Sequence, residues 1–216
     1  MSSLSQEISG LQYHSGDKPL DENEIAANPF LQFEKWFKEA VKSEGDKANA
    51  VVLSTATPDG KPSARVVLLK GLEHESFVFY TNYDSRKGKE LIENPFASMT
   101  FFWSSLEKQV RIEGKVQKVS ASDSDEYFKK RAKGSQAGAW ISPQSSVIPG
   151  REVLEQKHHN FIIEHENKQI QRPPFWGGFA IIPSRIEFWQ GRASRLHDRI
   201  LYTVERDNWK IERLAP

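Results

Sequence analysis

Cysteine is absent from the 216 residues of this chain. This absence excludes disulfide bonds, a thiolate nucleophile and cysteine-based metal sites, and it fits a reducing compartment. No apolar run approaches the roughly 20 residues that a membrane-spanning helix needs. The first ten residues, MSSLSQEISG, have neither the basic nor the apolar segment of a signal peptide. We therefore expect a cytoplasmic protein that does not contact membranes.

Excess charge is also missing, because the net charge is only +1. A balanced chain gives no case for a nucleic-acid or membrane partner, so any anion must be bound by local clusters. Stock catalytic motifs are absent too: there is no glycine-rich phosphate loop after a strand, no GxSxG and no HExxH. We expect no metal site, since His158 and His159 lie in a charged helix whose face is expected to be solvent-exposed.

The hydrophobic content of 38% and the charged content of 27% indicate a globular protein. Residues 1–27 are polar and weakly patterned, which predicts a mobile N-terminal arm. Residues 28–216 are expected to form a single domain. Its helices are predicted over 28–45, 84–94, 122–131 and 151–166, with a loop-rich segment at 134–150.

A period of two predicts strands, which begin with a hairpin whose turn is TPDGKP. Gly114 suggests a bulge or a barrel corner in the middle of one strand. Many antiparallel strands with few helices favour a mainly β fold, either a small barrel or a sandwich with attached helices. The strands are predicted at 50–56, 63–70, 76–81, 96–103, 108–119, 178–190, 197–205 and 209–214.

The stretch EFWQGRASRLHDR at 187–199 places Arg195, His197 and Arg199 at every second position. In an extended chain these three side chains share one face, with Trp189 just before the break at Gln190. Such a row is costly to bury unless an anion lies opposite it. A solvated edge strand is the alternative interpretation.

Other basic and hydroxyl side chains lie at strand ends and helix starts. Arg86 and Lys87 begin a predicted helix, where free N–H groups favour an anion. Tyr127 and Arg131 are four residues apart on another helix, with Ser135 just beyond it, and this set suits a phosphate. Surface solubility is the alternative for Arg86 and Lys87, and an ordinary helix-surface pair is the alternative for Tyr127 and Arg131. Together the clusters outline at least two anion sites, as two phosphorylated ring compounds held face to face would require.

Several segments closely resemble the pyridoxine/pyridoxamine 5′-phosphate oxidase family. The FWQG and RLHDR blocks within 187–199 are highly specific to it, and the resemblance runs from about Asn28 to Pro216. The resemblance implies an FMN-binding split β-barrel that forms a homodimer with the flavin at the subunit interface. The remaining matching segments are RVVLLK (65–70), FYTNYDSRKGKEL (79–91), KQVRIEGKV (108–116), YFKKRAKGSQAGAW (127–140), QSS (144–146) and ERLAP (212–216).

The resemblance also implies a role for each matching residue. Arg195 and His197 would act over the pyridine ring as the catalytic pair, with Leu196 between them contacting substrate. The substrate phosphate would be held by Lys70, Tyr127, Arg131 and Ser135. FMN would be bound by Arg65, Val66, Val67, Leu68, Leu69, Lys70, Tyr80, Thr81, Arg86, Lys87, Gln109, Gln144, Ser145, Trp189 and Arg199.

The implied reaction oxidises pyridoxamine or pyridoxine 5′-phosphate to pyridoxal 5′-phosphate. A hydride passes from substrate C4′ to the flavin, and O2 then reoxidises the flavin and leaves H2O2. Two positions depart from the family pattern. No arginine precedes Tyr13, where the family often has one thought to close over substrate, and Ala132 replaces the usual proline. The rival interpretations are another split-barrel flavoprotein, such as a reductase-like or stress-type protein, and a non-catalytic pyridoxal phosphate carrier.

Overall fold

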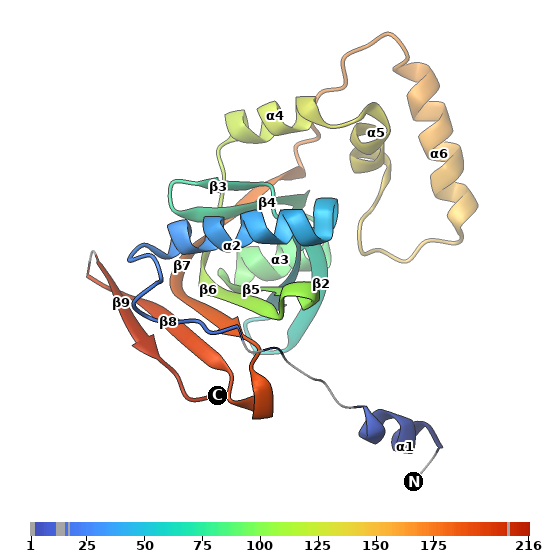
Figure 1. The fold of residues 1–216 in the computed structure, drawn as a ribbon. Helices are drawn as coiled ribbons and strands as arrows, with labels where there is room; N and C mark the ends of the chain where they lie inside the picture. The colour runs from blue at the N-terminus through green and yellow to red at the C-terminus, as the bar shows by residue number, and fades with distance from the viewer. Residues whose placement is uncertain (1–2, 12–15, 17, 207) are drawn as a thin grey trace. The chain divides into compact units, whose positions relative to one another are not determined.

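The computed structural model describes residues 3–11, 16, 18–206 and 208–216 (Figure 1). The chain divides into two compact units. Unit 1 comprises Met1–Ala48, Phe102–Val110 and Ile186–Pro216, and unit 2 comprises Asn49–Phe101 and Arg111–Arg185. Each unit is described by itself below.

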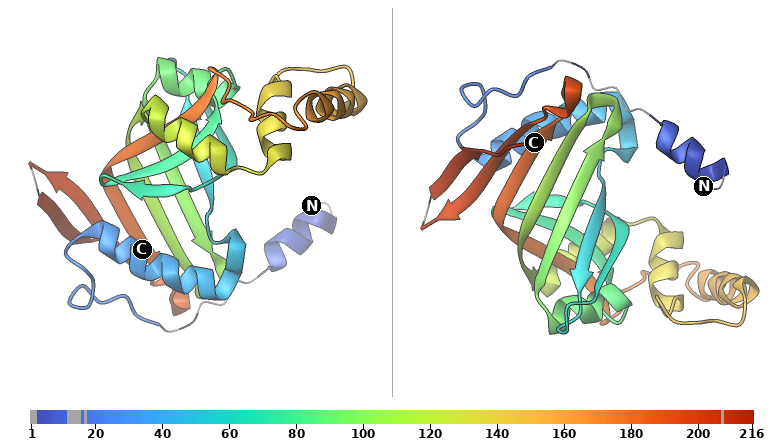
Figure 2. Two further views of the ribbon diagram at one scale, coloured as in Figure 1. Left: turned by 90° about the horizontal axis from the view of Figure 1, so that it is seen from above. Right: turned by 90° about the horizontal axis from the view of Figure 1, so that it is seen from below.

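The strands of the described residues form one sheet with the order β2-β1-β5-β6-β7-β4-β3, and β8 pairs with both β7 and β9. The pairs β1–β2, β1–β5, β3–β4, β4–β7 and β8–β9 are antiparallel, and Figure 2 shows β8 and β9 side by side as a hairpin. The mainly β fold class is therefore confirmed. The strands are β1 (Ala50–Ala56), β2 (Pro62–Leu68), β3 (Gly71–Glu73), β4 (Ser76–Asn82), β5 (Phe96–Trp103), β6 (Lys108–Lys118), β7 (Trp176–Gln190), β8 (Asp198–Glu205) and β9 (Asn208–Arg213).

The hairpin of β1 and β2 determines which side chains of the two strands lie beside each other. Its register pairs Leu53 with Arg65 and Thr55 with Ser63. Gly60 has a φ of +85° in the connecting turn, a backbone conformation that glycine adopts without strain. Because side chains alternate along a strand, Ser63 and Arg65 lie on the same face of β2.

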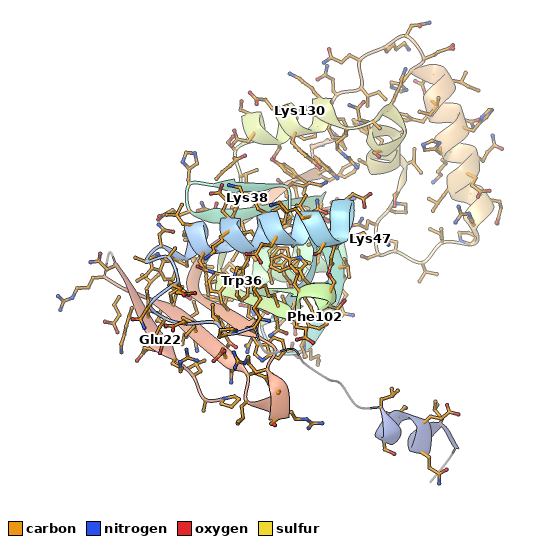
Figure 3. The ribbon with its side chains drawn as sticks, viewed as in Figure 1. Glu22, Trp36, Lys38, Lys47, Phe102 and Lys130 are labelled. Carbon is orange, nitrogen blue, oxygen red and sulfur yellow. The ribbon has the colours of Figure 1, made fainter. Side chains whose placement is uncertain are left out.

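Unit 1 is built on α2 (Pro29–Glu44), whose start follows from its sequence. The Asn28 side chain accepts hydrogen bonds from two backbone N–H groups of the first turn, and proline occupies the first helical position. Trp36 is buried and meets the ring of Phe188 edge-on, whereas Lys38 on the same helix is exposed (Figure 3). The helix therefore buries one face and leaves the other to solvent, as its period predicts.

Four helices belong to unit 2, and one of them was not predicted. They are α3 (Arg86–Glu93), α4 (Ala121–Lys130), α5 (Lys133–Ile141) and α6 (Arg151–Glu164). The prediction of a loop over 134–150 was wrong in its first part, because Lys133–Ile141 form α5. That helix contains two glycines and has no side-chain N-cap, so its local signal is weak. Its Ala137 and Ala139 are buried, and α5 lies beside α6 (Figure 1), so packing supplies what propensity does not.

Three further features refine the expectations. Residues of the predicted arm form α1 (Ser3–Gly10), while the mobility of the arm and the single-domain expectation stay predictions.

Gly114 lies so close to the carbonyl of Ile182 that a Cβ atom would come within 2.1 Å of its oxygen. This close approach explains the glycine. In the described part of the chain, no helix is long and apolar enough to cross a membrane.

Candidate functional site

Unit 2 holds a group of linked polar side chains centred on Glu90 of α3. Oε2 of Glu90 accepts hydrogen bonds from Thr55, from Ser63 at 2.7 Å and from Arg65 at 3.3 Å. Its Oε1 accepts a hydrogen bond from Nε of Arg86 at 2.8 Å. We call these five residues the Glu90 network. The network brings together Arg65 and Arg86, both expected to bind FMN.

Lys87 extends this cationic region on the next position of α3. Its Nζ donates to Gln144 at 2.8 Å, to Ser85 at 3.2 Å and to Thr81 at 3.3 Å. Burial and the nearby Arg65 lower the pKa of Lys87 to about 8, although Glu90 acts in the opposite direction. Thr81, Lys87 and Gln144, all expected in the FMN site, therefore lie in contact. Ser145 follows in the same loop with a positive φ of 73° and an exposed side chain.

β2 lies at the edge of the sheet, where it pairs with β1. An edge strand presents backbone N–H and C=O groups that no second strand uses. Val66 and Leu68 are exposed on this strand, whereas Leu69 after its end is buried. The edge backbone of 66–68, expected to line the flavin, therefore lies on the open side of the sheet. The N–H and C=O of Leu69, also expected there, are already bonded to Asn49. Val67 is half-buried, and Lys70 is exposed after the strand, with its N–H bonded to Val78.

A second group in unit 2 stacks aromatic rings against an arginine. The rings of Tyr80 and Tyr127 are 3.9 Å apart and nearly parallel, and Tyr80 also stacks on Trp176 at 5.6 Å. The guanidinium of Arg131 lies 4.5 Å from the centre of the Trp176 ring, a cation–π contact. We call these four residues the Trp176 stack.

The guanidinium of Arg131 is incompletely satisfied. Its Nη1 is buried and has no hydrogen-bond partner among the described residues. Burial lowers the pKa of Arg131 because the charged form is desolvated, and Tyr127 opposes this. A buried guanidinium with an unused donor is a candidate ligand for an anion. Ser135, expected to help it, is exposed in the first turn of α5.

Unit 1 holds the expected catalytic pair. The row expected for Arg195, His197 and Arg199 on one extended face was wrong. Residues 193–195 form a 3-10 turn, Arg195 has a φ of +60°, and only Arg199 of the three lies in β8. Arg195 and Leu196 are exposed. The tight turn after Gly191 interrupts the alternation on which the expectation was built.

His197 and Arg199 have fixed neighbours within unit 1. The His197 ring lies 4.6 Å from the ring of Trp189, and its Nδ1 accepts a hydrogen bond from the N–H of Arg192. Arg199 donates twice to the carboxylate of Glu187, at 2.9 and 3.1 Å. This pairing raises the pKa of Arg199. Glu187 is thus the anion that the burial of Arg199 required. Gln109 is half-buried in β6 of the same unit.

Several residues of these groups were missed by sequence reasoning, among them Thr55 and Ser63 of the Glu90 network. Glu90 looked like a surface residue of a charged helix, and its only signal was its spacing of four residues from Arg86. Trp176 gave no signal beyond its aromatic ring. Glu187 stands two residues before Trp189, and strand alternation could have assigned it to one face. The expected role of Tyr13 lies outside the described residues. The described residues contain no group of three or more histidine, cysteine or acidic side chains placed to hold a metal ion.

Comparison with solved structures defines the class of the fold. PhzG from Burkholderia lata 383, determined with tetrahydrophenazine-1-carboxylic acid, is 28% identical to this chain with a TM-score of 0.87, over 93% of this chain and 99% of that chain. A pyridoxamine 5′-phosphate oxidase-related, FMN binding protein from Nostoc punctiforme shares the fold, with 17% identity, a TM-score of 0.70 and coverage of 89% and 100%. The fold is a split β-barrel, as predicted.

Comparison of sequences identifies the family. A family model for pyridoxamine 5′-phosphate oxidase matches residues 37–162, and one for the pyridoxine 5′-phosphate oxidase C-terminal dimerisation region matches residues 176–216. The pyridoxine/pyridoxamine 5′-phosphate oxidase of Nostoc sp. is 56% identical over 91% of this chain and 92% of its own length. The enzyme of that name from Paraburkholderia xenovorans is 51% identical, with coverage of 91% and 93%. The chain belongs to the pyridoxine/pyridoxamine 5′-phosphate oxidase family, and the match to the dimerisation region supports a homodimer.

Proposed function

We propose that this protein is an FMN-dependent oxidase that converts pyridoxamine or pyridoxine 5′-phosphate to pyridoxal 5′-phosphate. FMN, when bound, would supply the chemistry of a two-electron oxidation at substrate C4′, with O2 as the final acceptor and H2O2 as its product. With pyridoxamine 5′-phosphate the oxidised imine would be hydrolysed by water, and the nitrogen would leave as ammonia. The protein supplies binding and alignment. We place the reaction in the cytoplasm and the flavin at the interface of a homodimer.

The observation that carries the proposal is the buried Nη1 of Arg131, which has no partner among the described residues. Desolvating a guanidinium without satisfying its donors costs free energy, and a phosphate that accepts them restores it. Tyr127 lies beside this arginine through the Trp176 stack and adds a phenol donor. Lys70 and Ser135, both exposed, complete the proposed clamp for the substrate phosphate.

A second set of cations fits the phosphate of FMN. Arg65, Arg86 and Lys87 converge where α3 begins, and the open edge of β2 fits the polar rim of the flavin ring. A flavin and a pyridine ring, each with one phosphate, need two such cationic groups, and unit 2 provides both. Gln109, Trp189 and Arg199, which belong to unit 1, are also proposed to bind FMN.

The reacting end of the substrate is assigned to Arg195, Leu196 and His197. Arg195 is exposed at the tip of its turn, so its guanidinium is free to lie over a bound ring. His197 is anchored by Trp189 and by the Arg192 N–H, which leaves its Nε2 to face substrate. Holding the donor carbon in contact with its acceptor can lower the barrier by about 7–11 kcal/mol at the ideal limit.

The test is an oxygen-free titration of the purified protein. A yellow protein should bleach when pyridoxamine 5′-phosphate is added without oxygen, and it should recover its colour in air with one H2O2 per substrate. A non-catalytic carrier would bind the aldehyde product and form no peroxide. A reductase-like flavoprotein would be yellow but would not bleach with this substrate. Either of the last two results would refute the proposal.

A further inference from the structure

Glu90 is a buried carboxylate to which the proposed reaction gives no role. It is only 3% exposed, and both of its oxygens accept hydrogen bonds within the Glu90 network. The hydroxyl groups of Thr55 and Ser63 come from two paired strands, and Arg86 comes from the preceding turn of α3. The carboxylate is thereby fixed in position and orientation by three separate elements.

The neighbours of Glu90 are cations that repel each other. Arg65 and Arg86 bind opposite oxygens of the carboxylate, and the positive charge of Arg65 also disfavours the charged form of Lys87. Burial alone would raise the pKa of Glu90, but the hydrogen bonds from Thr55, Ser63 and Arg86 hold it at about 2. Glu90 is therefore a fixed anion between two guanidiniums throughout the physiological pH range.

Arg86 has hydrogen-bonding capacity left over. It uses its Nε on Glu90, and among the described residues its terminal nitrogens make no hydrogen bond, while its side chain is 62% exposed. A guanidinium held at one edge presents the other edge in a defined direction, since the group is planar and rigid. Arg65 is held more completely, by Thr55, Ser63, Glu90 and the carbonyl of Leu53.

We propose that Glu90 is a positioning residue for the cofactor, which holds Arg65 and Arg86 in the arrangement that binds the phosphate group of FMN. The inference rests on FMN being the cofactor, as the proposed function states. Glu90 does not touch the phosphate in this assignment. It prevents the two arginines from separating, so less entropy is lost when the phosphate binds.

A purely electrostatic role and a positioning role for Glu90 predict opposite changes in FMN affinity when Glu90 is replaced. Replacing Glu90 by glutamine removes a negative charge beside the phosphate site, so Coulomb's law alone predicts tighter FMN binding. Loss of positioning predicts weaker binding. Riboflavin has the same ring and ribityl chain as FMN but no phosphate, so its affinity reports on the rest of the pocket.

The experiment measures the Kd of FMN and of riboflavin for the full-length apoprotein by quenching of flavin fluorescence. For Glu90→Gln we expect the FMN Kd to rise about 10-fold or more, the loss typical of a charge-assisted hydrogen bond, with the riboflavin Kd unchanged. Glu93→Gln is the matched control, because it removes the same charge from an exposed position of α3 and should alter neither value.

The other possible results would contradict either the positioning role of Glu90 or the proposed function. An FMN Kd that falls or stays constant in Glu90→Gln would refute the positioning role, and equal losses for both flavins would show a merely structural one. If the wild-type protein binds neither flavin, the proposed function fails instead. Should Glu90→Gln not fold, Ser63→Ala removes one hydroxyl donor to Glu90, and we expect an FMN Kd about 3-fold higher with riboflavin unaffected. An unchanged FMN Kd in Ser63→Ala would equally refute the inference.

Discussion

Two arginines of unit 2 are held by opposite kinds of neighbour. Arg65 is bound to the carboxylate of Glu90, whereas Arg131 lies over the ring of Trp176 and keeps a buried donor unused. A carboxylate neutralises a guanidinium, but a ring only orients it. Arg131 therefore retains more of its capacity to bind an anion, at a cost to the stability of the free protein.

Replacing Arg131 by methionine should separate these two effects. We expect Arg131→Met to raise the unfolding free energy of the ligand-free protein by about 1 kcal/mol, or about 2–4 °C in Tm, because a buried unsatisfied donor is removed. The KM for pyridoxamine 5′-phosphate should rise about 10-fold or more, since charge-assisted hydrogen bonds to the phosphate are lost.

Arg172→Met is the control for that measurement. Arg172 is also largely buried, but it is paired with Asp125 at 2.7 Å and donates to the backbone carbonyl of Trp176. Its loss should lower the Tm because its partners are left unsatisfied. If Arg131→Met were destabilised as strongly as Arg172→Met, then Nη1 of Arg131 would not be an unsatisfied donor that lowers the stability of the ligand-free protein.

Lys87 should make FMN binding depend on pH. Its pKa in the free protein is lowered to about 8, so it loses its charge as the pH rises through that value. A bound phosphate favours the charged form, so the FMN Kd should increase as the pH rises above 8; the phosphate itself titrates at about pH 6 and affects only the acidic end of the range. Riboflavin binding should not follow this curve, and Lys87→Arg should abolish the dependence, because arginine stays charged. Fluorescence titrations between pH 6 and 10 test this.

The same pKa affects folding with the opposite sign. The folded protein binds the Lys87 proton less tightly than the unfolded chain does, so this group opposes folding fully below about pH 8. Its unfavourable contribution decreases as the pH rises from about 8 toward the ordinary lysine value. Lys87 thus favours cofactor binding at the pH at which it disfavours the fold.

At the scale of elements, two glycines are expected to respond oppositely to an added methyl group. Gly138 lies in α5 with no atom within 4 Å of an added Cβ, so Gly138→Ala should stabilise by about 0.5–1 kcal/mol. Gly114 in β6 would place its Cβ 2.1 Å from the Ile182 oxygen. Gly114→Ala should therefore destabilise by several kcal/mol, because backbone atoms must move. Urea denaturation measures both, and a stable Gly114→Ala protein would contradict the close approach.

At the scale of the whole molecule, the β1–β2 hairpin exposes three neighbouring apolar side chains on one face. Val52, Val66 and Leu68 are 40%, 64% and 47% exposed, and Val52 pairs directly with Val66. Exposed apolar surface of this kind is typical of a protein interface. The match of residues 176–216 to a dimerisation region supports a homodimer but does not include these three residues. We predict that the second copy of the chain covers this face.

A charge on this face should dissociate the dimer. We expect Val52→Glu to shift the mass in sedimentation equilibrium from dimer toward monomer, because a buried unpaired carboxylate is costly. FMN should be lost in parallel if it binds at the interface. Ile163→Glu on α6, where Ile163 is 60% exposed, is the control and should leave the dimer intact. A fully dimeric Val52→Glu protein would exclude this face as the interface.

The sequence by itself determined most elements and the family. Apolar periodicity placed β1 and β5 at their observed bounds, and Asn28 with Pro29 marked the start of α2. These signals are local: a period of two or 3.6 and a capping side chain act within a few residues. The family followed from the order of residues in 187–199, and it needed no geometry.

Only the tertiary structure decided which charges neutralise each other. Glu90 contacts Thr55, Ser63 and Arg65, which lie 25–35 positions away in the sequence. Trp176 meets Arg131 across a larger separation, of 45 positions. The turn at 193–195 likewise broke the alternation that had aligned Arg195 with Arg199. Side-chain pairing depends on distances in space, and burial sets how strong each pairing is. A local pattern of residues reports neither quantity.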